Sequence, residues 1–220
     1  ALISLSDLGD TEMRDCKKGP FYFTDPQRQL ANNSAVYTEK PSAEEFLDEW
    51  VALIKSKSGE RGIFNRGSLS RTVPERRLPH LEKYVTNGRM TGLVGVNPCG
   101  EIVLQSKQFC NLSEIIARPG DSVESLLRKI RIATIIGTYQ STLTNFPYLS
   151  KEWKENCEEE RLLGVSISGQ WDCPIVRKPE VLDKLRKESV RINQQYAKRF
   201  GINASTAITC VKPSGNLSQT

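Results

Sequence analysis

Long amphipathic patterns, separated by short β-branched runs, restrict this chain to a mixed fold of helices and strands. Apolar residues recur at helical spacing and predict three helices, over about 42–58, 122–142 and 179–200. Ser42 with Glu45 three residues later forms a capping-box pattern, and Gly201 is well placed to end the third helix. Short β-branched stretches predict four strands, at 92–96, 101–104, 162–168 and 206–211.

Strands that alternate with long helices favour an α/β fold with a largely parallel sheet. In such folds the chemistry lies in loops at the carboxyl ends of strands. Residues 97–101 and 212–216 are the two segments placed in that way. We find no internal repeat and no inter-domain linker, so we expect residues 1–220 to form one segment without an internal boundary. Because both ends look internal, we expect a piece of a longer chain.

The composition is ordinary for a soluble globular protein, with 38% hydrophobic and 26% charged residues. No apolar run approaches the roughly 18 residues that span a bilayer, so no membrane partner is expected. The net charge of +5 comes from interspersed charges, which does not favour a stable nucleic-acid partner. None of the six cysteines forms a Cys-x-x-Cys pair, so we predict no metal site. Six cysteines are too few for a disulfide scaffold, and no secretory signal is visible, so we expect a cytoplasmic location with reduced thiols.

Cys99 is the first candidate for chemistry. Pro98 fixes its φ and Gly100 permits a positive φ, which places Cys99 at the tip of a tight loop. If the flanking residues are extended, the side chains of Asn97, Cys99 and Glu101 point to one face. A thiol, an amide and a carboxylate could there act on a hydroxylated substrate. The alternative is a buried structural cysteine in a turn, with Glu101 in solvent.

Two further segments carry candidate residues. Cys110 follows Cys99 by eleven residues and could be a redox partner, because dithiol oxidation supplies two electrons; it could equally be a small core residue. In the last segment a predicted strand leads into Ser214, Gly215 and Asn216, which could cradle a phosphate if a helix begins there. Pro-Ser-Gly is also an ordinary turn sequence.

Together these motifs resemble a known family. Residues 97–102 (NPCGEI), followed by Cys110-Asn111-Leu112, closely resemble the finger loop of ribonucleotide reductases. The glycine after the cysteine is similar to the adenosylcobalamin-dependent (class II) branch. Other stretches resemble the same family in the same order, at 1–10, 31–34, 58–64, 164–169 and 212–219.

The resemblance implies part of a ten-stranded α/β barrel, with the finger loop at its centre. It implies that Cys99 becomes a thiyl radical and abstracts the 3′-hydrogen of the ribose. Glu101 would take the 3′-hydroxyl proton, and Asn97 would hold the ribose hydroxyls. Cys110 would be one of two cysteines that reduce the intermediate, with its partner upstream of Ala1.

The resemblance also implies the ligands. Adenosylcobalamin would generate the radical by homolysis of its cobalt–carbon bond. The substrate would be a ribonucleotide, with the triphosphate favoured over the diphosphate, and a deoxynucleotide effector would bind a specificity loop just before Ala1. Thioredoxin or a similar dithiol would exchange with cysteines beyond residue 220. The residues implied to bind substrate are Ser214, Gly215, Asn216 and Ser218 at the phosphates, and Asn33 and Ser34 in the pocket.

Three alternatives stay open. The nearest is a class I reductase large subunit, whose radical comes from a separate metal-containing subunit; Gly100 and residues 212–215 favour class II. A cysteine hydrolase would need His80, in what we expect to be a polar surface loop, within hydrogen-bond reach of Cys99. A basic nucleic-acid-binding module is the third.

Overall fold

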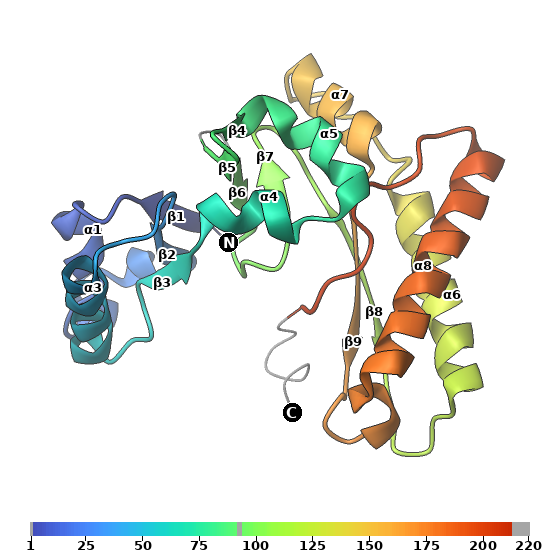
Figure 1. Cartoon of the computed structure of the whole chain (residues 1–220), viewed down its shortest axis with the longest axis horizontal. Helices are drawn as coiled ribbons and strands as arrows, with labels where there is room; N and C mark the ends of the chain where they lie inside the picture. Colours follow the sequence, from blue (N-terminus) through green and yellow to red (C-terminus); the bar gives the residue numbers. More distant parts are fainter. Residues whose placement is uncertain (1, 92–93, 213–220) are drawn as a thin grey trace. The chain divides into compact units, whose positions relative to one another are not determined.

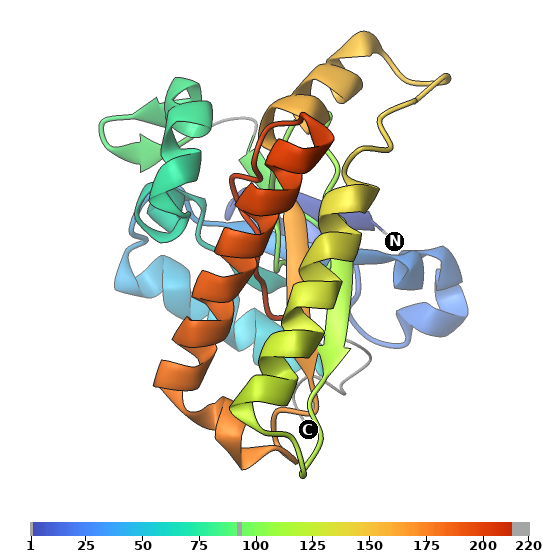
Figure 2. The same ribbon diagram turned by 90° about the vertical axis from the view of Figure 1, so that its right-hand side faces the viewer.

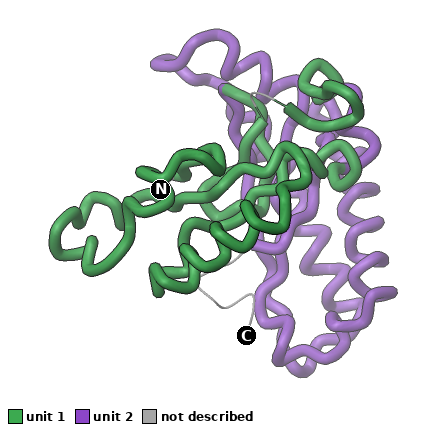
Figure 3. Tube along the Cα trace, turned by 60° about the vertical axis from the view of Figure 1, so that its left-hand side comes forward, with its two compact units in different colours: residues 1–73, 81–106 green, residues 74–80, 107–220 purple. Residues whose placement is uncertain are grey.

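The computed structural model describes residues 2–91 and 94–212, and its chain folds into helices and short sheets (Figure 1). Contacts divide it into two compact units, residues 1–73 with 81–106 and residues 74–80 with 107–220 (Figure 3). The chain therefore passes from one unit to the other three times. The expectation that residues 1–220 belong to one catalytic barrel domain concerns a longer chain, and it stays a prediction. Over the described ranges, no helix combines the length and the apolar character that a membrane span requires.

Unit 1 is built on a parallel sheet of order β1-β2-β3. Its strands are Leu2–Ser6 (β1), Ala31–Val36 (β2) and Gly62–Phe64 (β3). The register places Leu5 opposite Ser34, and Ser34 opposite Gly62. Because successive side chains alternate between the two faces of a strand, Asn32, Ser34 and Val36 share one face of β2, and Asn33 lies on the other.

Two antiparallel hairpins complete the strands of unit 1. They are β4 (Val85–Thr86) with β5 (Arg89–Met90), and β6 (Val94–Val96) with β7 (Val103–Gln105). An apolar cluster formed by Val36, Phe64, Leu69, Met90 and Val94 joins the sheet to both hairpins. The helices of unit 1 are α1 (Thr11–Asp15), α2 (Phe21–Thr24), η1 (Pro26–Leu30), α3 (Ala43–Ser56), η2 (Arg66–Ser68), α4 (Leu69–Thr72) and η4 (Glu82–Tyr84).

Unit 2 contains the parallel pair β8 (Asn111–Ile116) and β9 (Leu163–Ser168). The helices α6 (Val123–Gln140) and α8 (Pro179–Phe200) lie side by side and pack on this pair (Figure 2). The core between the layers is apolar and includes Ile115, Leu126, Ile130, Val165 and Leu185. The other helices are η3 (Glu75–Arg77), α5 (Leu78–Leu81), α7 (Lys151–Glu160) and η5 (Pro174–Arg177).

The three predicted helices are present with the predicted caps. Ser42 and Glu45 form the capping box of α3, and Gly201 closes α8 at a φ of 66°. The end of α3 differs, because Lys57 takes the left-handed conformation before Gly59. The expectation of a largely parallel sheet is wrong for β6 and β7: the six residues between them are too few for a parallel crossover, which takes a dozen or more.

The predicted strand at 206–211 is only a single bridge, between Thr209 and Val165. The segment still runs along β9, since the Val165 N–H donates to Ile208 O and the Cys210 N–H donates to Val165 O. The strand β8 was not predicted, because its mixed run Asn-Leu-Ser-Glu-Ile-Ile has neither clean alternation nor an apolar block.

Candidate active site

The loop between β6 and β7 presents Cys99. The Asn97 N–H donates to Ile102 O at 3.0 Å and closes the base of the loop, and the Gly100 N–H donates to Asn97 O at 2.9 Å. Gly100 has a φ of 82°, the left-handed conformation that glycine adopts without steric cost. Cys99 is exposed at the tip, as the sequence predicts.

The residues on either side of Cys99 are not extended. The prediction that Asn97, Cys99 and Glu101 point to one face assumed extended flanks, so the structure does not meet its condition. Residues 97–102 form a turn. The Asn97 side chain points back into it, where Oδ1 accepts a hydrogen bond from the Ile102 N–H at 2.9 Å. The Ile102 N–H thus bonds to a side chain and not to the backbone of the opposite strand, as asparagine side chains often arrange in turns. Asn97 therefore shapes the loop, and its predicted contact with ribose hydroxyls stays a prediction.

Glu101 carries the most unusual group of the loop. Both carboxylate oxygens are buried, and neither has a hydrogen-bond partner among the described residues. Burying a carboxylate without a partner is costly, so an arrangement of this kind is typical of a group that meets a ligand. The alternative of Glu101 in solvent is thus wrong.

The strand β2 contacts the Cys99 loop through the side chain of Asn32. Asn32 Nδ2 donates to Pro98 O, one residue before Cys99. Ser34 shares this face, and its Oγ would lie 3.0 Å from a Cβ at Gly62, so a larger residue there would require the Ser34 side chain to move by a few tenths of an ångström. Asn32 was not among the predicted site residues, since nothing in the local sequence shows that a residue 66 positions before Pro98 reaches the loop.

Asn33 lies on the other face of β2, so the structure does not place it beside Ser34. It is 4% exposed, and its Nδ2 donates to Met13 O and lies 3.4 Å from Cys16 Sγ. Its Oδ1 is buried and has no hydrogen-bond partner within residues 2–91 and 94–212. Asn33, Cys16 and Lys17 line a pocket of about 390 Å³.

Cys110 belongs to unit 2 and directly precedes β8. It is half-buried. Its neighbour Asn111 is fixed to the start of β9, because both its N–H and its Nδ2 donate to Leu162 O, at 2.9 and 3.0 Å. The preceding residue is fixed as well, since the Phe109 N–H lies 3.4 Å from Cys157 Sγ.

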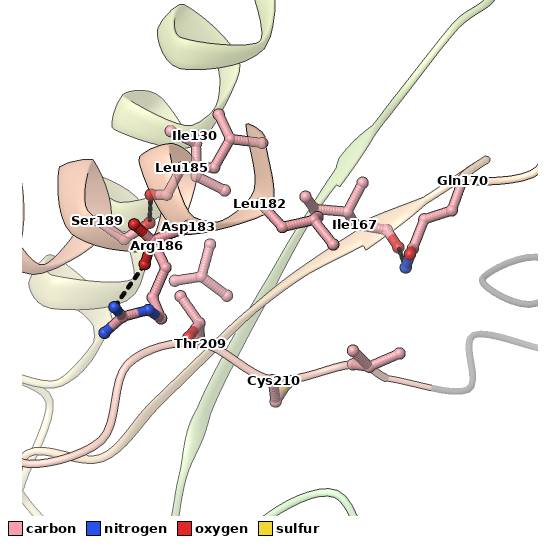
Figure 4. A pocket seen from close by; sticks show the side chains of 12 residues that line it. Ile130, Ile167, Gln170, Leu182, Asp183, Leu185, Arg186, Ser189, Thr209 and Cys210 are labelled. Atoms are coloured by element: carbon pink, nitrogen blue, oxygen red, sulfur yellow. Dashed lines mark hydrogen bonds and ion pairs between the residues drawn. The ribbon is translucent and has the colours of Figure 1, made fainter. Parts of the chain in front are cut away.

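The predicted phosphate-binding residues Ser214, Gly215, Asn216 and Ser218 lie outside the described residues. The segment that leads to them is docked on β9, where the Lys212 N–H donates to the buried Ser166 Oγ at 2.9 Å. A pocket of about 400 Å³ lies between α8 and β9, with the side chains of Ile167, Leu182 and Cys210 around it (Figure 4).

His80 does not lie in a loop. It is part of the short helix α5, and its Nδ1 is 3.0 Å from Glu159 Oε1 of α7. Its ring therefore has a carboxylate partner in unit 2, and nothing in this contact involves Cys99.

Comparison with known proteins bears on the resemblance seen in the sequence. No family model matches the chain. It is 28% identical over 154 residues to the adenosylcobalamin-dependent ribonucleoside-triphosphate reductase of Lactobacillus leichmannii, which is 57% of this chain and 21% of that protein. The protein of the same name from Lacticaseibacillus paracasei is 27% identical over 198 residues, 77% of this chain and 25% of the relative. The protein of the same name from Euglena gracilis is 30% identical over 130 residues, which cover 57% of this chain and 17% of that protein.

Solved structures give the same result for the fold. A crystal structure of a B12-dependent (class II) ribonucleotide reductase matches with a TM-score of 0.65 and 24% identity, over 99% of this chain and 32% of that one. The class Id ribonucleotide reductase alpha subunit of Actinobacillus ureae matches with a TM-score of 0.62 and 15% identity, over 98% of this chain and 46% of that one.

The chain is a homologue of the ribonucleotide reductases. Its curated relatives carry the name of the adenosylcobalamin-dependent branch, which confirms the resemblance drawn from the cysteine loop. The α/β fold class is confirmed as that of part of a reductase large chain. This reductase homologue spans between 17% and 25% of the length of the three curated relatives.

Proposed function

We propose that this chain carries the radical cysteine of a cytoplasmic, adenosylcobalamin-dependent ribonucleotide reductase, which converts ribonucleoside triphosphates to 2′-deoxyribonucleotides. The observation that carries the proposal is an exposed Cys99 followed two residues later by a buried carboxylate that has no hydrogen-bond partner in the described part of the chain. The names of the relatives support the cofactor and the reaction.

Cys99 starts the reaction in this proposal. Bound adenosylcobalamin would supply the radical that oxidises its thiol, and an exposed sulfur at a loop tip is accessible to such a group. The Cys99 thiyl radical then takes the hydrogen atom from C3′ and becomes a thiol again. At the end it returns that hydrogen atom to C3′, so that Cys99 is regenerated.

Glu101 acts as the base. Its buried carboxylate accepts the 3′-hydroxyl proton. The 2′-hydroxyl takes a proton from the thiol pair that includes Cys110 and leaves as water. A substrate hydroxyl would give the carboxylate the hydrogen-bond donor that the described residues do not provide.

Cys110 supplies reducing equivalents together with a second thiol. Two thiols give two electrons and two protons and become a disulfide, which balances the loss of one oxygen as water. We propose that thioredoxin or a similar dithiol reduces this disulfide. Ser214, Gly215, Asn216 and Ser218 would hold the phosphates, Asn33 and Ser34 would line the pocket, and a deoxynucleotide would act as effector.

The test is an assay of deoxynucleotide formation by the native protein with adenosylcobalamin and a dithiol. Wild-type activity that requires adenosylcobalamin and disappears in Cys99→Ser supports the proposal. Cys173→Ala, at a buried cysteine in the apolar core of unit 2 that has no part in the proposed chemistry, is the control. Normal activity in Cys99→Ser would overturn it.

The fold likeness to a class Id alpha subunit makes a class I large subunit the second candidate. The same assay separates the two. Turnover that needs an added metal-bearing subunit, and not adenosylcobalamin, favours class I.

A further inference from the structure

The helix α7 holds the three residues that precede Cys110. Lys107 forms an ion pair with Glu152, and its backbone O accepts from Asn156 Nδ2 at 3.2 Å. The ring of Phe109 stacks on Trp153 with 4.6 Å between the centroids. Thus one side of this single helix contacts the residues immediately before the cysteine.

Gln108 is the innermost residue of this segment and is 4% exposed. Its Nε2 donates to Glu160 Oε1 at 2.8 Å, and its Oε1 accepts from Arg77 Nη2 at 3.3 Å. One amide thus bonds to both members of an ion pair. This double contact fixes the orientation of the amide. Exchanging its O and N would place the amide oxygen against the Glu160 carboxylate oxygen and the NH2 group against the N–H donors of Arg77.

The ion pair itself is buried. Arg77 is 2% exposed and Glu160 is 0% exposed, and Arg77 Nε lies 2.7 Å from Glu160 Oε2. Thr206 Oγ1 donates to the same carboxylate oxygen at 2.7 Å. Burial alone raises the pKa of Glu160, but the hydrogen bonds and charge of Arg77, with Gln108 and Thr206, outweigh it and the pKa is lowered. Glu160 is therefore ionised in the folded protein, and Gln108 is bound by a charged acceptor.

On its other side Cys110 is followed by Asn111, which is bonded twice to Leu162 O. The cysteine therefore lies between two anchored neighbours, one held by α7 and its ion pair, the other by β9. A thiol that forms a disulfide must meet narrow limits of Cα and Cβ separation. Fixing the backbone on both sides helps to meet these limits.

We propose that Gln108, held by the Arg77–Glu160 pair, is a positioning residue for Cys110. The inference rests on the proposed function for the role of Cys110 as a reductant. Without the Gln108 amide, residues 107–110 lose their innermost attachment and Cys110 samples positions from which the disulfide forms slowly. Gln108 touches neither substrate nor cofactor in this account, so its loss slows turnover and leaves substrate binding unchanged.

The first measurement is the rate at which iodoacetamide alkylates each cysteine of the native protein, without nucleotide or cofactor, read by mass spectrometry. In Gln108→Ala we expect Cys110 to react several-fold faster, because the segment opens locally more often, and Cys99 to react at its wild-type rate. Cys157 will compete poorly, since burial raises the pKa of its thiol. Gln194→Ala, an exposed glutamine of α8 in the same unit, is the matched control.

The second measurement is deoxynucleotide formation at varied substrate concentration. We expect kcat of Gln108→Ala to fall about tenfold or more with KM unchanged, since small displacements of a reacting group cost large factors in rate. Gln108→Met, with nearly the same length and no amide, gives the same pattern and replaces the alanine variant if that variant fails to fold. Unchanged kcat, or equal acceleration of alkylation at Cys99 and Cys110, would overturn the proposal. If the wild type forms no deoxynucleotide, the proposed function fails, while the alkylation rates still decide whether Gln108 positions Cys110.

Discussion

At the scale of single residues, the cysteine loop shows what local sequence can and cannot predict. Pro98 and Gly100 act through their own backbone preferences, so the exposed tip at Cys99 follows from three adjacent letters. The burial of Glu101 depends on the residues around it in the fold, and no pattern in the sequence indicates it. The same is true of Asn32, whose bond to Pro98 joins distant parts of the chain.

The buried Glu101 carboxylate leads to a prediction with two opposite effects. In Glu101→Gln we expect turnover to fall by about 10²–10⁴-fold, the usual contribution of a positioned base. We expect the free energy of unfolding to stay equal or to rise, because a neutral amide costs less to bury than a carboxylate to which no described residue donates. Turnover assays and urea unfolding measure the two. Lower stability together with normal turnover would show that the carboxylate serves the fold instead.

At the scale of helices and strands, prediction succeeded where an amphipathic pattern carried its own end signals. α3, α6 and α8 have regular apolar spacing, and Ser42, Ser122 and Gly201 mark their ends. α7 was missed because its sequence, Lys-Glu-Trp-Lys-Glu-Asn-Cys-Glu-Glu-Glu, is almost wholly polar. Its structural role comes from buried polar contacts, above all Glu160, and a charged residue reads from sequence as exposed.

The start of α6 provides a prediction about pH. Asp121 accepts hydrogen bonds from Lys129 Nζ, Ser125 Oγ and the Arg118 N–H. Burial raises its pKa, but these bonds outweigh burial and lower the pKa from 3.8 to about 2. Since the folded-state pKa is the lower one, Asp121 stabilises the fold above about pH 4, and this contribution is lost as the pH falls through 2.

We therefore expect Asp121→Asn to lower the free energy of unfolding at pH 6, and the difference from wild type to shrink as the pH falls from 4 towards 2. Urea unfolding across this range measures it. Contributions from other carboxylates, such as Glu160, are common to both proteins and cancel. Asp172→Asn, at an exposed turn of unit 2, is the control. A difference that is constant with pH would contradict the assigned cause.

At the scale of the whole molecule, the division into two units could not be read from the sequence. Residues 74–80 lie between two segments of unit 1 but belong to unit 2. The reason is physical: Arg77 pairs with Glu160, and Arg76 Nε donates to Ser205 O at 3.4 Å. A boundary set by such long-range polar contacts leaves no linker composition to detect, since Glu-Arg-Arg reads as an ordinary polar run.

If the Arg77–Glu160 pair attaches residues 74–80 to unit 2, its loss should change the hydrogen-exchange rates of particular segments. Glu160→Gln leaves Arg77 buried without its counter-charge, and breaking such a pair costs about 3–5 kcal/mol. Amides of 74–80 and 107–111 should then exchange faster, because those segments are attached through Glu160, its partner Arg77 and Gln108. Amides of 31–36 and 94–105 in unit 1 should keep their wild-type rates, since local opening follows cooperative units and not sequence neighbours. Hydrogen exchange with mass spectrometry resolves these segments. Acceleration spread evenly over both units would mean that they unfold as one, and that residues 74–80 owe their place to something other than the ion pair.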